Sequence, residues 1–127
     1  MIVIDASTAL AGLLNNGKAR ELLAAERVCA PDIVDTGVAD GLRQLTRSQQ
    51  VSADAAQAAL ETWQQLGIRR YPSRPLADRV WELNETLDTA PATSAALAER
   101  LDTAWVTADP VAGASSAVTC PVTVVPN

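Results

Sequence analysis

Five short apolar runs alternate along the chain with longer segments that carry helical periodicity. The runs are rich in β-branched and aliphatic residues, which favour strands buried on both faces. Parallel neighbours in a sheet need a crossover, and the intervening segments are long enough to supply helices. The expected strands cover residues 2–4, 27–30, 68–71, 105–107 and 122–125, and the expected helices cover 5–14, 18–25, 31–47, 52–67, 76–86 and 91–101. We therefore predict one α/β domain, residues 1–127, with a central, mostly parallel sheet of four or five short strands flanked by helices.

The composition excludes several kinds of chemistry. The chain has no histidine, which removes Ser–His and Cys–His pairs, histidine bases and most zinc sites. It also has no phosphate-cradling G-x-x-x-x-G-K or G-x-G-x-x-G motif. Any catalysis would have to use carboxylates, which favour a hard cation such as Mg²⁺.

Charge and hydropathy bear on partners and compartment. A net charge of −5 argues against nonspecific nucleic-acid binding by the whole surface. No apolar stretch approaches the ~20 residues needed to span a bilayer, and the N-terminus lacks the pattern of a signal peptide. We expect a cytoplasmic protein without membrane contact, in which Cys29 and Cys120 stay reduced.

Two acids fall at the carboxyl ends of predicted strands. Asp5 directly follows residues 2–4, and Asp109 follows residues 105–107 after one alanine. Each has a hydroxyl residue two positions away, Ser7 and Thr107, and such a pair can hold a hydrated cation against a phosphate. In open α/β sheets ligands bind at this edge. Helix capping is the alternative interpretation, since Asp5 precedes a helix and Asp109 precedes a proline.

The sequence resembles the PIN-domain family, specifically the VapC ribonuclease toxins of bacterial toxin–antitoxin pairs. The likeness spans nearly the whole chain, and the order and spacing of its parts make it specific. Its main segments are Ile2-Val3-Ile4-Asp5-Ala6-Ser7, Ala30-Pro31-Asp32-Ile33-Val34-Asp35, Leu42-Arg43-Gln44-Leu45, Ile68-Arg69-Arg70-Tyr71-Pro72, Arg79-Val80-Trp81-Glu82-Leu83, Ala96-Leu97-Ala98-Glu99 and Val106-Thr107-Ala108-Asp109.

This resemblance implies a four-acid site that binds Mg²⁺ or Mn²⁺ and cleaves RNA with a metal-activated water. Two of the four acids correspond to Asp5 and Asp109, but the other two positions hold Gly37 and Pro91, neither of which can supply a ligand. Gly37 and Gly41 are one helical turn apart, so another backbone can pack closely there. Asp40 and Asp88 are each three residues from a lost acid, and a rearranged site would have to use them.

Two functions follow from this pattern. The first is a VapC-like protein with an incomplete metal site, a weakened or inactive ribonuclease that acts by binding an antitoxin-like peptide, a second copy of itself or RNA. The alternative is an active Mg²⁺-dependent endoribonuclease toxin that uses Asp5, Asp109 and rearranged Asp40 or Asp88. A third and more distant interpretation is an unrelated α/β domain whose strand-end acids only cap helices.

The remaining expectations concern basic and aromatic residues. An RNA- or partner-contacting rim would comprise Ser7, Thr107, Arg69, Arg70 and Arg74, although the arginines could equally lie over the surface with their heads in water. The three tryptophans sit among apolar neighbours and are expected in the core rather than as nucleotide-stacking platforms. They are Trp63, Trp81 and Trp105.

Overall fold

The computed structural model describes all residues from 1 to 127 and contains one five-stranded sheet. The strands lie in the order β3-β2-β1-β4-β5, and every neighbouring pair is parallel. The strands are β1 (Ile2–Ile4), β2 (Val28–Pro31), β3 (Arg69–Tyr71), β4 (Ala104–Thr107) and β5 (Val122–Val124). The prediction of an α/β domain with a parallel sheet is confirmed.

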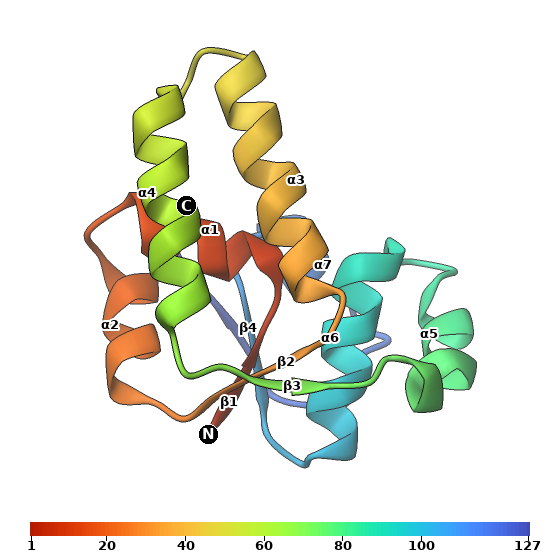
Figure 1. Ribbon diagram of the computed structural model, residues 1–127. Coiled ribbons are helices and arrows are strands. Elements are labelled where there is room, and N and C mark those ends of the chain that lie inside the picture. The colour runs from red at the N-terminus through yellow and green to blue at the C-terminus, as the bar shows by residue number, and fades with distance from the viewer.

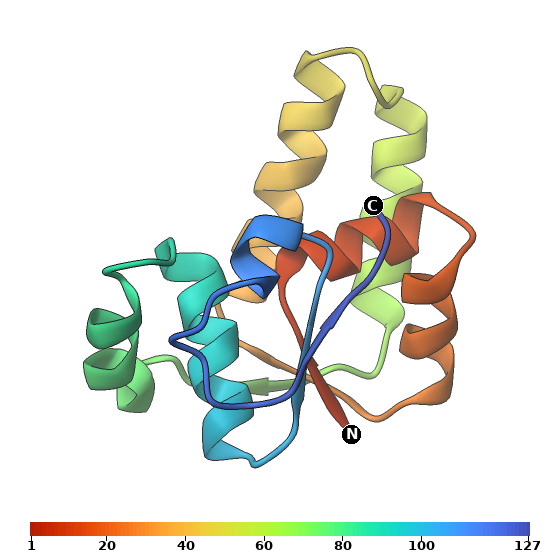
Figure 2. The same ribbon diagram turned by 180° about the vertical axis from the view of Figure 1, so that it is seen from behind.

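Helices cover both faces of this sheet (Figure 1). The helices are α1 (Ala6–Leu14), α2 (Lys18–Ala25), α3 (Val34–Arg47), α4 (Ala53–Gln65), α5 (Ala77–Leu83), α6 (Thr89–Arg100) and α7 (Pro110–Gly113), with a short 3₁₀ turn, η1 (Arg74–Leu76), before α5. In Figures 1 and 2, α3 and α4 stand side by side as a hairpin that extends beyond the sheet, and α5 lies at the periphery.

Two helix starts and one additional helix are the main differences from the sequence-based expectation. The third helix begins at Val34 because Pro31 still belongs to β2, where it is opposite Tyr71. The alanine-rich helix begins at Thr89, so Pro91 occupies its first turn, where a missing N–H costs no helical hydrogen bond. The four-residue α7 was not predicted, although Asp109 followed by Pro110 is a typical helix start.

The core consists of two aliphatic layers, one on each face of the sheet. One layer joins the sheet to α1, α3 and α4 around Trp63, and the other joins it to α5 and α6 around Trp105. Trp81 was expected in this core, and that expectation is wrong, because its side chain is 80% exposed. Leu83 is the buried anchor of α5, and Trp81 lies two residues before it, on the opposite side of the helix.

An ion pair holds α5 against α6. Arg79 donates two hydrogen bonds to Glu99, from Nε to Oε1 at 2.7 Å and from Nη2 to Oε2 at 3.0 Å. The backbone N–H of Thr119 also donates to Glu99, at 2.8 Å, so the loop before β5 joins the same network. Because Arg79 is engaged in this network, it fixes which face of α5 points outward.

Two further expectations can be compared with the structure. Cys29 and Cys120 are free thiols, as predicted. No helix has the length and apolar character that crossing a bilayer would require.

Candidate functional site

The two strand-end acids lie on neighbouring strands. β1 pairs with β4, and Ile4 is opposite Val106, so Asp5 and Asp109 both follow the same carboxyl edge of the sheet. The first turns of α1, α3, α6 and α7 converge at this edge in both views (Figures 1 and 2). The structure thus brings three expected helices and the additional helix α7 together at this edge.

Ser7 and Thr107 connect the two strands at this edge. The Ser7 and Thr107 hydroxyl oxygens are 3.3 Å apart, and Ser7 Oγ accepts a hydrogen bond from the Ala108 N–H at 2.9 Å. Ser7 Oγ in turn donates to Asp5 Oδ1 at 2.5 Å, and Thr107 Oγ1 accepts from the Asp109 N–H at 3.2 Å. The two hydroxyls expected beside the acids therefore do lie there, and they are used in hydrogen bonds within the protein.

The Asp5 carboxylate is almost completely enclosed. Its residue is 6% exposed, and three donors reach it: Ser7 Oγ and the Thr8 N–H to Oδ1, and the Trp105 indole N–H to Oδ2 at 3.3 Å. A carboxylate offers about four lone-pair sites, so about one remains. Hydrogen bonds to a charged group each contribute roughly 1.5–3 kcal/mol, and a cation would have to compete with them.

Asp109 is exposed and caps α7. Its Oδ1 accepts from the backbone N–H groups of Val111 and Ala112, at 3.0 and 3.2 Å. Asp5 likewise caps α1 through the Thr8 N–H, at 3.1 Å. Both acids therefore cap helices, as the alternative interpretation of the sequence predicted.

Gly37 and Gly41 form the face of α3 that contacts α1. A Cβ atom at position 37 would stand 2.9 Å from the Cβ of Ala6, and one at position 41 would stand 2.4 Å from a methyl group of Leu10. The Leu10 side chain could rotate away, whereas the Ala6 Cβ is fixed to the backbone of α1. The close packing expected of this glycine pair therefore occurs, and it occurs against the helix that Asp5 caps.

Asp40 and Asp88, which lie about one helical turn from Gly37 and Pro91, do not complete a metal site. Asp40 is exposed, and its Oδ2 accepts from the Gln44 amide at 2.8 Å along α3. Asp88 is exposed at the start of α6 and makes no side-chain capping bond. The structure contains no group of three or more His, Cys, Asp or Glu side chains able to hold a metal ion. The residues at this edge do not fit a resident Mg²⁺ or Mn²⁺ ion.

The expected arginine rim is divided. Arg70 forms a two-point ion pair with Asp35, at 2.6 and 2.8 Å, and its guanidinium stacks 5.6 Å from the centre of the Trp63 ring. The Trp63 indole N–H also donates to Asp35, at 2.8 Å. Arg70 is therefore engaged in joining β3, α3 and α4. Sequence reasoning did not single out Asp35, because nothing local shows that α4 brings a tryptophan to it.

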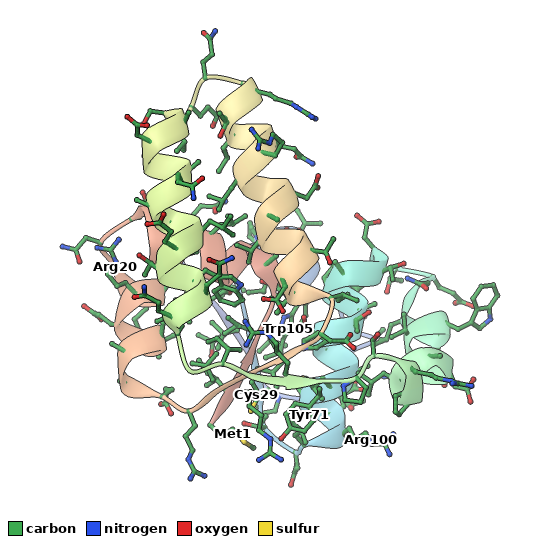
Figure 3. The ribbon with its side chains drawn as sticks, in the orientation of Figure 1. Met1, Arg20, Cys29, Tyr71, Arg100 and Trp105 are labelled. Carbon is green, nitrogen blue, oxygen red and sulfur yellow. The ribbon has the colours of Figure 1, made fainter.

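Arg69 and Arg74 remain at the surface. The Arg69 guanidinium lies 5.2 Å from the Tyr71 ring centre, and Arg74 is exposed in η1. In Figure 3 Tyr71 lies toward the lower edge of the molecule, while Trp105 lies inside it among the strands. Arg69 and Arg74 therefore lie over the surface with their guanidinium groups in water.

A groove that the sequence did not suggest opens beside Ser7. It has a volume of about 1000 Å³ and runs between α1, α3 and α4. Its apolar lining includes Leu10, Leu14, Leu45 and Val51, and the C-terminal Asn127 lies at its edge. Figure 2 shows the C-terminus beside α1 and α4. Because its walls come from three separate helices, only the tertiary arrangement could reveal it.

The fold and the paired strand-end acids define a PIN-like domain, and relatives give the family. No family model matches the chain. It is 47% identical to ribonuclease VapC9 of Mycobacterium tuberculosis over 127 residues, which is 100% of both chains. The crystal structure of M. tuberculosis VapC20, a sarcin-ricin loop cleaving toxin, matches 91% of this chain and 95% of its own with a TM-score of 0.64 and 21% identity. A crystal structure of a Pyrobaculum aerophilum protein matches 95% of this chain and 81% of its own, with a TM-score of 0.70 and 17% identity. The chain belongs to the VapC family of PIN-domain toxins.

The Asp35 ion pair makes stability depend on pH. The hydrogen-bonded guanidinium of Arg70 holds the pKa of the Asp35 carboxyl below its usual range, with help from the Trp63 indole. A lowered folded-state pKa gives stability that is present at neutral pH and is lost as the pH falls through that pKa. We predict that Asp35→Asn lowers Tm at pH 7 by on the order of 2 °C, since the pair is partly exposed.

The control is Asp32→Asn, an exposed acid outside the ion pairs. Thermal unfolding followed by circular dichroism should show a difference between wild type and Asp35→Asn that shrinks toward pH 3. A difference that stays constant with pH would contradict the ion-pair interpretation.

Proposed function

We propose that this chain is a VapC-like protein whose acidic site no longer supports efficient metal-dependent RNA cleavage and that it acts by binding a partner. The observation that carries the proposal is the state of Asp5. Its two carboxylate oxygens are hydrogen-bonded inside the protein, and no third acid joins it and Asp109. Mg²⁺ prefers near-octahedral oxygen coordination and dehydrates reluctantly, so a single enclosed carboxylate is a poor anchor.

One observation favours the alternative of an active Mg²⁺-dependent endoribonuclease toxin. The relative with 47% identity over the full chain is named a ribonuclease. Such an enzyme would need Asp40 or Asp88 to approach Asp5 and Asp109, which in turn would require α3 or the start of α6 to move. The Gln44 hydrogen bond to Asp40 and the exposed position of Asp88 count against this rearrangement.

Metal binding separates these functions directly. We predict that calorimetric titration of Mn²⁺ gives no saturable heat in the wild-type protein and no change in Asp5→Asn or Asp109→Asn. Asp5 keeps only about one free lone-pair site, Asp109 caps α7 through Oδ1, and no third acid completes a site. A VapC ribonuclease relative serves as the positive control. Saturable binding that disappears in both variants, together with Mn²⁺-dependent RNA cleavage, would establish the active enzyme.

The groove between α1, α3 and α4 supports an antitoxin-like partner. It is lined by partly buried leucine and valine side chains next to Ser7, so an apolar segment of another protein could cover it and reach the carboxyl edge of the sheet. RNA is less favoured, because the net charge is −5 and Arg70 is engaged with Asp35.

We predict that Leu45→Asp at the groove abolishes co-purification with a co-expressed antitoxin-like protein. A charge buried against an apolar partner is costly, which gives the expected loss. Ala58→Asp, on an exposed position of α4, is the matched control and should leave co-purification unchanged. Equal recovery of the partner with both variants would exclude this groove.

Homodimer formation is a separate proposal, and α5 supports it. Trp81 is 80% exposed on α5, and α5 lies at the periphery of the molecule (Figure 1). Large aromatic side chains are enriched at protein interfaces. We predict that Trp81→Ser weakens self-association by at least tenfold in sedimentation equilibrium, while Val111→Ser, at another exposed apolar residue, does not. An unchanged dimer in Trp81→Ser would place the interface elsewhere.

A further inference from the structure

The position of Trp105 follows from the register of the sheet. Trp105 in β4 is opposite Val3 in β1. Side chains at positions i and i+2 of a strand project to the same face, so Asp5 follows Val3 on the face that Trp105 shares. The indole ring of Trp105 therefore reaches diagonally from β4 toward Asp5, two residues beyond Val3, and its N–H donates to Asp5 Oδ2 at 3.3 Å. Trp105 is itself completely buried, so this donor cannot turn toward water.

A second contact involves Ala6, the residue that follows Asp5. A Cβ atom at position 37 of α3 would stand only 2.9 Å from the Cβ atom of Ala6. Any residue other than glycine at position 37 would therefore push α3 away from the start of α1. Trp105 and Gly37 thus contact the Asp5 region from two independent elements, β4 and α3.

We infer that Trp105 and Gly37 are positioning residues that hold Asp5 in a closed, metal-free arrangement, so that returning the two missing acids does not by itself restore a metal site. This inference rests on the proposed loss of metal binding. The indole N–H takes one lone-pair site of Asp5 Oδ2. A side chain at position 37 would require α3 and α1 to separate, because its Cβ would stand 2.9 Å from that of Ala6. Loss of the acids and closure of the site are therefore two separate changes in this protein.

The test compares an acid-restored variant with an opened variant. The first carries Gly37→Glu and Pro91→Asp. The second adds Trp105→Phe, which removes the donor while keeping an aromatic ring, and Ala6→Gly, which removes the Cβ facing position 37. The expected result is no saturable Mn²⁺ binding by calorimetry in the acid-restored variant and binding at least tenfold tighter in the opened variant. Circular dichroism checks that each is folded.

Two results would overturn the inference: equal Mn²⁺ affinity in the two variants, or no binding in either. Saturable binding by the wild type would instead refute the proposed function, so the two failures are distinguishable.

A measurement on the unmodified chain covers the case in which a variant does not fold. The Trp105 indole proton, assigned with Trp105→Phe, should exchange with solvent at least a hundredfold more slowly than that of exposed Trp81. It should also exchange faster in Asp5→Ala. Exchange as fast as that of Trp81, or exchange unaffected by Asp5→Ala, would show that the indole does not hold the carboxylate.

Discussion

The hydrogen bonds of the Asp5 carboxylate join β1 and α1, at the start of the chain, to β4, where Trp105 lies 100 residues further along the sequence. Through Thr8 they fix the start of α1, through Trp105 they connect β1 to β4, and through Ser7 they extend to the backbone at Ala108. A buried carboxylate without partners would be strongly destabilising, so each donor is required once the acid is enclosed. The carboxylate that a metalloenzyme would use for coordination is here hydrogen-bonded to three groups of the fold.

Gly37 and Pro91 stand where the related ribonucleases are expected to carry acids, and neither adds a charge. Gly37 costs about 1 kcal/mol of helix stability relative to alanine, yet it lets α3 approach Ala6 on α1. Pro91 in the first turn of α6 supplies no charge and costs no hydrogen bond. Clustered carboxylates repel one another unless a cation is present, so a site with fewer acids is more stable when empty. Packing and electrostatics therefore both favour the closed arrangement over a restored one.

The sequence was sufficient to predict the fold and the sheet edge that carries the candidate site, because hydrophobic periodicity and the position of acids at strand ends are local signals. Ile2–Ile4 and Ala104–Thr107 could be recognised as strands, and their parallel pairing places Asp5 and Asp109 at one edge. The solvent exposure of Trp81 was missed because apolar neighbours on α5 do not say which side of a short helix faces α6. The Trp105–Asp5 bond was missed because it depends on the register between β1 and β4, which no local pattern encodes.

The groove beside Ser7 does not depend on the acids at the sheet edge. Its walls are the packed helices α1, α3 and α4, and none of its lining residues is an acid. The close approach of α3 to α1 at Gly37 and Gly41 sets the separation of two of these walls. Selection for binding in the groove would then preserve Gly41, a lining residue, independently of any carboxylate. Under the proposed binding function, the packing of these helices would maintain the groove, while the hydrogen bonds of Asp5 keep the acidic edge within the fold.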